Sequence, residues 1–153
     1  MQKATGINPS TITGAIYFHR ITDGKLSGTL RATLEIFKRI CGENFYLRVA
    51  FVTTMWDIIK GGALERYNTM HTELDRRYLR LSEHGPEMFK CCNDEPSCEA
   101  VVKYFLELAK SRTGKGAQLL LFKEISLSSN VRRTAAGQEI MKKQTGGGRC
   151  VIL

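Results

Sequence analysis

The sequence predicts an α/β fold in which three short parallel strands alternate with helices. Three apolar segments, at residues 14–18, 47–53 and 88–89, are short enough to be strands of a buried sheet. Each is followed by a longer stretch whose apolar residues recur every three or four positions, as on one face of a helix. Strand–helix units repeated in this way form a parallel sheet with right-handed crossovers, and 153 residues have room for one such domain.

The first strand is expected at Gly14–Phe18, an uninterrupted run with β-branched and aromatic side chains. A turn at Asp23-Gly24 follows, and Ser27 or Thr29 is suited to cap the next helix. Gly42 is suited to the left-handed position that ends a helix. The apolar positions of this helix share one face: Leu30, Leu34, Phe37 and Ile40.

The second strand, Leu47–Thr53, is the clearest in the sequence. A long amphipathic helix is predicted after the glycines at 61–62. Its apolar residues step by three and four: Leu64, Tyr67, Met70, Leu74, Tyr78 and Leu81.

The third strand is a short piece around Met88-Phe89, and it leads into the polar sequence 91–94. Pro96 and Ser97 are typical of a helix start. The helix that follows has apolar residues on one side: Val101, Phe105 and Leu108.

The C-terminal region is strongly basic. Residues 110–153 contribute +7 of the net charge of +8, from nine Lys or Arg residues against Glu124 and Glu139. A helix is predicted at Thr134–Met141 and a flexible hinge at Gly146–Gly148, whereas 119–122 fits either a helix or a strand. Such a tail suits an anionic membrane surface, or it is a solubilising, partly disordered end. Its basic residues are not interleaved with aromatic ones, so specific binding of nucleic acid is not expected.

Several of these motifs, in this order, resemble the uncharacterised fungal G-domain proteins. The similarity rests on Gly14–Ile21 followed by Leu26–Gly28, on Val52–Asp57, on Asn93 and on Thr134–Gly137. That family belongs to the TRAFAC class of P-loop GTPases and is distantly akin to septins and immunity-associated GTPases. The resemblance extends over nearly the whole chain.

The resemblance implies a partial Ras-like P-loop NTPase domain. Residues 1–112 would be the C-terminal half of a G domain, with strands equivalent to its fourth, fifth and sixth, and 113–153 a basic tail. The phosphate loop G-x-x-x-x-G-K-[ST], the switch threonine and the Asp-x-x-Gly motif do not occur in the sequence. Thr113–Gly116 resembles the phosphate loop only superficially. Glycine follows Lys115 at the position where that loop has a hydroxyl residue to reach Mg²⁺.

These absences predict an incomplete or degenerate GTPase-like domain that has no Mg²⁺ site and does not hydrolyse GTP by itself. Only 13 residues precede the first strand, which is too few for three further strands and a helix. One expectation is therefore a gene-model fragment whose first half is encoded upstream.

The resemblance assigns a guanine-recognition half-site to four residues: Thr54, Met55, Asp57 and Asn93. In G domains an aspartate at this strand end accepts two hydrogen bonds from the guanine ring N–H and amino group. Met55 stands where the pattern Asn/Thr-Lys-x-Asp has lysine, so it supplies apolar contact alone. GDP or GTP held mainly through the base should bind weakly, at about millimolar affinity. Without the resemblance, a loop or helix-capping carboxylate is the simpler interpretation of Asp57.

A second hypothesis is a non-catalytic, membrane-tethered adaptor. The final residues Cys150–Leu153 have the form Cys-aliphatic-aliphatic-X, which predicts geranylgeranylation of Cys150 unless the match is due to chance. The basic tail would then be the second signal for membrane attachment. The strand at Gly14–Phe18 would leave one sheet edge open, where we expect self-association or a partner chain.

The remaining chemistry-bearing residues are expected to be structural. The N-terminus has no secretory signal pattern, so we expect a cytoplasmic protein, membrane-associated if lipidated, with reduced thiols. Cys91, Cys92 and Cys98 with His84 fit no zinc spacing and are predicted to be buried free thiols. Trp56 is expected to pack against the end of the sheet.

Overall fold

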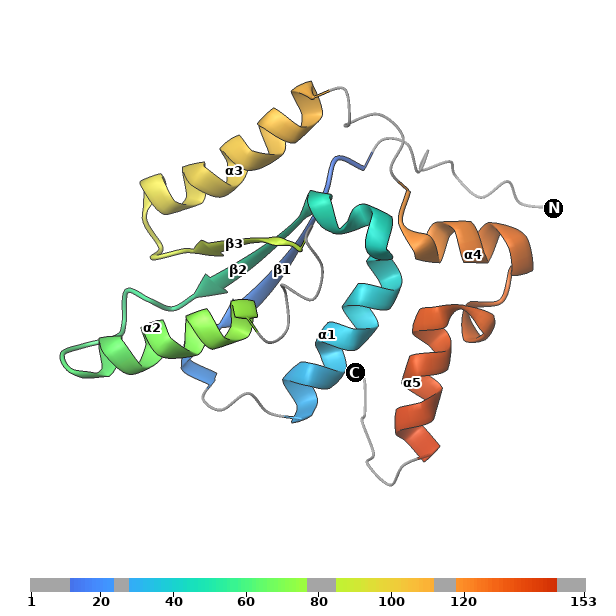
Figure 1. Cartoon of the computed structure of the whole chain (residues 1–153), viewed down its shortest axis with the longest axis horizontal. Coiled ribbons are helices and arrows are strands. Elements are labelled where there is room, and N and C mark those ends of the chain that lie inside the picture. The colour runs from blue at the N-terminus through green and yellow to red at the C-terminus, as the bar shows by residue number, and fades with distance from the viewer. Residues whose placement is uncertain (1–11, 24–27, 77–84, 112–117, 146–153) are drawn as a thin grey trace.

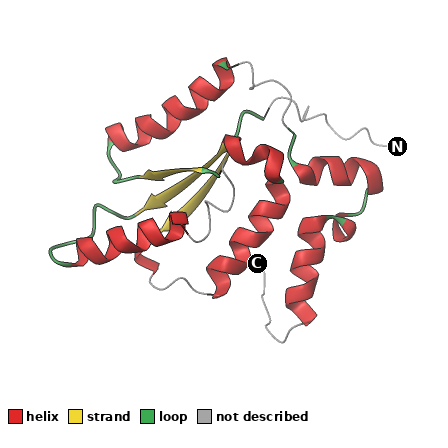
Figure 2. Cartoon of the chain, viewed as in Figure 1, coloured by secondary structure: helices red, strands yellow, loops and turns green. Residues whose placement is uncertain are grey.

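The structure is a computed structural model that describes residues 12–23, 28–76, 85–111 and 118–145. Its centre is a parallel sheet of three strands in the order β1-β2-β3, surrounded by helices (Figure 1, Figure 2). The predicted α/β class, the three strands and their parallel direction are confirmed. The strands are β1 (Ala15–Arg20), β2 (Val49–Thr54) and β3 (Glu87–Lys90).

β2 lies between its two neighbours and is buried on both faces, as its continuous apolar sequence predicts. In the strand register, Tyr17 of β1 lies beside Phe51, and Phe51 lies beside Met88 of β3. The rings of Tyr17 and Phe51 stack with centroids 5.1 Å apart. Side chains alternate between faces along a strand, so Phe18 and Val52 belong to the opposite face.

Two helices cover the Phe51 face, α1 (Gly28–Cys41) and α2 (Ala63–Leu74) (Figure 1). α1 agrees with the predicted helix. Of the two alternative caps, Ser27 lies outside the described residues and Thr29 lies inside the helix. α2 ends at Leu74, and most of the expected continuation as far as Leu81 falls on residues 77–81, which are not described. The buried core on this face comprises Ile21, Leu34, Phe51, Trp56 and Leu74.

The opposite face is covered by α3 (Glu95–Lys110). Val101 packs on Ala50 and Val52. α3 leaves part of β1 uncovered on this face, since Phe18 is 63% exposed. Among the described residues β1 pairs with β2 alone, so its other edge has no strand partner there.

Two features of the fold were not predicted correctly or were left open. Leu47, expected to begin the second strand, lies in the 3₁₀ helix η3 (Glu43–Arg48), and the strand begins at Val49. This offset arises because η3 packs Phe45 against the end of α1, leaving Leu47 exposed. The segment 119–122, which fitted either class, begins α4 (Leu120–Ser128).

The basic C-terminal region contains α4 and α5 (Ala135–Thr145), joined by η6 (Val131–Arg133). The predicted helix at 134–141 agrees with α5. Both helices contact α1 on the side away from the sheet (Figure 1). Thr134 and Ala136 are buried at this junction. In the part of the chain that the structure describes, no helix is both long enough and apolar enough to cross a bilayer.

Candidate functional site

The candidate site lies at the carboxyl edge of the sheet, where β2 and β3 end. Because the two strands are parallel, the residues that follow each of them meet at the same edge. The pairing continues past the end of β3, since the Cys91 N–H donates a 2.8 Å hydrogen bond to the Thr53 carbonyl. The structure therefore brings the loop that follows Thr54 beside the loop that contains Asn93.

Both loops contain a residue in the left-handed backbone region. Met55 has φ of 67° and Asn93 has φ of 57°. Asparagine tolerates this conformation, whereas for methionine it costs about 1–2 kcal/mol. Non-glycine residues with positive φ concentrate at functional sites and tight turns. The only other one among the described residues is Ser129, at the end of α4.

Trp56 anchors the β2 loop to the core. Its side chain is 7% exposed, and its Nε1 donates a 2.9 Å hydrogen bond to the Thr53 hydroxyl. The same hydroxyl lies 3.0 Å from Nδ1 of His71 on α2 and donates to the Phe89 carbonyl at 3.1 Å. One hydroxyl can accept two hydrogen bonds and donate one, so an Nδ1-protonated His71 satisfies the whole set. The expectation that Trp56 packs at the sheet end is correct.

Lys90 is a functional candidate that sequence reasoning missed. Its Nζ lies 4.5 Å from the centroid of the Trp56 ring, a cation–π contact, and donates a 2.7 Å hydrogen bond to Oδ1 of Asn68. Burial, together with this nearby ammonium, lowers the pKa of His71 to about 4. The signal was available, because Lys90 is the last residue of the third strand and so belongs to the same edge.

Asp57, the central residue of the predicted base site, is exposed beyond the Trp56 anchor. The pKa of the Cys92 thiol is raised by burial, then by the charges of Asp94 and Cys91, and further by Asp57. The Asp57 carboxylate is thus within electrostatic range of the β3 loop. Thr54 and Met55 are half-buried, and Asn93 is exposed.

The β3 loop is ordered by a helix cap that the sequence analysis did not assign. Asp94 Oδ1 accepts a 2.9 Å hydrogen bond from the Ser97 N–H at the start of α3. Hydrogen bonding to the Ser97 side chain and backbone lowers the pKa of Asp94. Ser97 Oγ in turn accepts a 3.0 Å hydrogen bond from the Cys92 N–H. These bonds hold Asn93 in place between the end of β3 and the beginning of α3.

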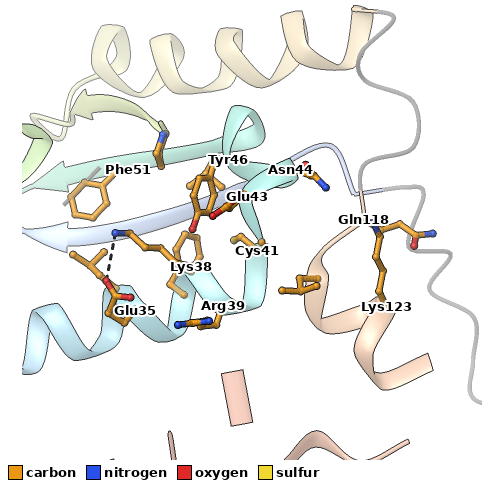
Figure 3. A pocket seen from close by; sticks show the side chains of 16 residues that line it. Glu35, Lys38, Arg39, Cys41, Glu43, Asn44, Tyr46, Phe51, Gln118 and Lys123 are labelled. Carbon is orange, nitrogen blue, oxygen red and sulfur yellow. Dashed lines mark ion pairs between the residues drawn. The ribbon is translucent and has the colours of Figure 1, made fainter. Parts of the chain in front are cut away.

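A separate cavity lies away from this edge. It has a volume of about 800 Å³ and opens among α1, η3 and α4, at the amino end of β2 (Figure 3). Lys38 projects into it, with Nζ 3.6 Å from Oε1 of Glu35 (Figure 3). None of the four predicted base-binding residues lines this cavity.

Other predicted sites are placed as follows. The last eight residues, which include Cys150, lie outside the described ranges. Within those ranges, no group of three or more His, Cys, Asp or Glu side chains is arranged to hold a metal ion. The prediction of buried thiols is wrong for the three cysteines that follow β3, because Cys98 is exposed and Cys91 and Cys92 are half-buried. His84, which was considered with them, lies outside the described residues. Comparison with protein-family models, curated proteins and solved structures found no match to this chain.

Proposed function

We propose that the carboxyl edge of β2 and β3 is a guanine-base half-site in a degenerate GTPase-like domain. The observation that carries this proposal is the meeting of the Asp57 loop with the Asn93 loop at one edge of a parallel sheet. Open α/β sheets bind ligands in the crevice outside the carboxyl ends of their strands.

The chemistry of the two loops supports a purine with donors on its Watson–Crick edge. An exposed carboxylate at Asp57 can accept from the ring N–H and the exocyclic amino group of guanine together. Adenine presents a ring acceptor at that position, which would face the carboxylate with no proton between them. The positive φ values of Met55 and Asn93 are backbone outliers of the kind that functional loops retain.

The affinity should be low. The sequence contains no phosphate-binding glycine loop, and backbone N–H groups of such a loop supply much of the nucleotide affinity in P-loop proteins. Base and ribose contacts alone correspond to a dissociation constant of about 1 mM. Hydrolysis is not expected, because it needs positioned charge around the γ-phosphate.

Ligand-observed NMR with guanosine and adenosine tests the proposal at this affinity. Guanosine should bind with a dissociation constant of about 1 mM and adenosine at least about tenfold more weakly. Asp57→Ala should remove the preference for guanosine. Glu107→Gln, which neutralises an exposed carboxylate on α3, is the matched control and should bind as the wild type does. Equal binding of both nucleosides, or no effect of Asp57→Ala, would contradict the half-site.

A second candidate function is supported by a different surface. Apolar side chains are exposed on β1 and on α3, and they comprise Ile16, Phe18, Val102 and Leu106. The outer edge of β1 has no strand partner among the described residues. Exposed apolar side chains and an open strand edge are both features that suit association with another chain. We propose, as the alternative, an interaction protein that binds a partner or a second copy here, with a geranylgeranyl group on Cys150 and the basic tail as its membrane attachment.

A further inference from the structure

Two cysteine sulfurs face each other at the beginning of α3. Sγ of Cys91, which follows β3, lies 3.5 Å from Sγ of Cys98, in the first turn of the helix. The Asp94 cap lies in the segment between the two cysteines, where the chain passes from β3 into α3. Cys98 is exposed and Cys91 is half-buried, so solvent reaches the pair.

The surroundings distinguish the two thiols chemically. The pKa of Cys91 is lowered mainly by a hydrogen bond from the Asn93 backbone N–H, with further help from Cys98 and Ser97. The pKa of Cys98 is raised, mainly because its thiol donates to the Cys91 sulfur. Thiolates rather than thiols are the nucleophiles in sulfur chemistry. We therefore expect Cys91 to be the attacking sulfur and Cys98 the resolving one.

We propose that Cys91 and Cys98 form a redox-active pair that peroxide converts to an intramolecular disulfide. The contact between the two sulfurs carries this inference, and the reaction requires no nucleotide. It is thus independent of the proposed base site, although the ring that closes contains Asn93.

The reaction balances with hydrogen peroxide as the oxidant. The Cys91 thiolate attacks one peroxide oxygen, the O–O bond breaks, and a sulfenic acid forms as hydroxide leaves. The Cys98 sulfur then attacks the Cys91 sulfur, the S–O bond breaks, and the departing hydroxide takes the Cys98 proton to give water. The two sulfurs lose two electrons in total, and the peroxide gains them.

The movement required is small. A disulfide bond is about 2.05 Å long, so the sulfurs must approach by about 1.5 Å. Rotation of the exposed Cys98 side chain can supply much of this distance. Cys92 is excluded as the partner, because it packs against the Phe51 core on the other side of the strand.

Peptide mass spectrometry of the full-length chain tests the pair directly. Trypsin releases residues 91–103 as one peptide that contains Cys91, Cys92 and Cys98. After peroxide treatment and alkylation, this peptide should lose two hydrogens and carry a single alkyl group, on Cys92. In Cys92→Ser the same hydrogen loss should occur at a rate within about twofold of the wild type. Cys98→Ser should stop at oxidised Cys91 without a disulfide.

Cys41 is an internal reference, because burial raises the pKa of its thiol to about 12. It should react at least about tenfold more slowly than Cys91 in the folded chain, and urea should remove the difference. Trp56 is buried, so its fluorescence reports whether each variant is folded. Full alkylation of all three cysteines after peroxide treatment, a Cys91–Cys92 bond, or a mainly intermolecular product would overturn the proposal.

Discussion

The indole Nε1 of Trp56 donates a 2.9 Å hydrogen bond to the hydroxyl of Thr53, three residues earlier in the chain. Thr53 is the last fully buried residue of β2, and Trp56 is the first buried residue after the strand. This bond closes the loop on itself and places Asp57 at the surface directly beyond it. The orientation of the proposed guanine-binding carboxylate therefore depends on a buried hydroxyl.

Replacing that hydroxyl should destabilise the protein. Thr53→Val keeps the side-chain shape but leaves the Trp56 N–H without its acceptor in a buried position. Such a loss costs about 1–3 kcal/mol. Urea denaturation followed by Trp56 fluorescence measures it, since the protein has a single tryptophan. Thr69→Val is the matched control on the exposed side of α2 and should change the stability by less than about 0.5 kcal/mol. Equal stability of the two variants would show that the network contributes nothing.

Stability should fall between pH 6.5 and 4 because of His71. Its pKa is about 4 in the folded chain, against 6.5 when unfolded, so in this window the unfolded state binds more protons. The free energy of unfolding then decreases as the pH falls. We expect a contribution of about 1–2 kcal/mol after allowing for solvent screening of the half-buried ring. Urea titrations at several pH values measure it.

His71→Gln is the control for the pH dependence. Glutamine retains a polar partner for Thr53 but does not titrate, so the wild type should lose more stability than this variant between pH 6.5 and 4. Parallel pH profiles of the two proteins would refute the assignment to His71.

Self-association should depend on the exposed face of β1. Phe18→Lys places a charge on this apolar surface and should weaken dimer formation by about tenfold or more. Leu127→Lys is a matched control, because Leu127 is 89% exposed and belongs to α4, outside the proposed surface on β1 and α3. Analytical ultracentrifugation over a range of concentrations compares the self-association of the two variants. A wild type that stays monomeric and melts independently of concentration would contradict self-association.

The three strands and most of the helices were predictable because their apolar patterns are local, whereas the segment 119–122 fitted either class. The run at 49–53 is buried on both faces, which only a central strand satisfies. The buried face of α1 was predictable from the helical spacing of its apolar residues, which include Leu34 and Phe37. The 3₁₀ helix η3 was not predictable, because the packing of Phe45 on α1 overrides the strand propensity of Leu47.

The candidate site was predictable only in part. Asp57 and Asn93 were assigned from a sequence resemblance, and their common edge follows from parallel pairing. The hydrogen bonds around Thr53 could not be inferred, because His71 comes from a helix 18 residues away in the sequence. The contact between Cys91 and Cys98 depends on the turn that Asp94 makes, which spacing alone does not reveal.

The most direct measurement of the central claim is the base preference of Asp57→Asn. Guanine presents two donors to the carboxylate, whereas xanthine presents one donor and one carbonyl acceptor, which match an asparagine amide. Ligand-observed NMR should show that the wild type prefers guanosine and that Asp57→Asn prefers xanthosine, each by about tenfold. If the substitution leaves the ratio of guanosine to xanthosine binding unchanged, Asp57 does not select the base and the half-site is refuted.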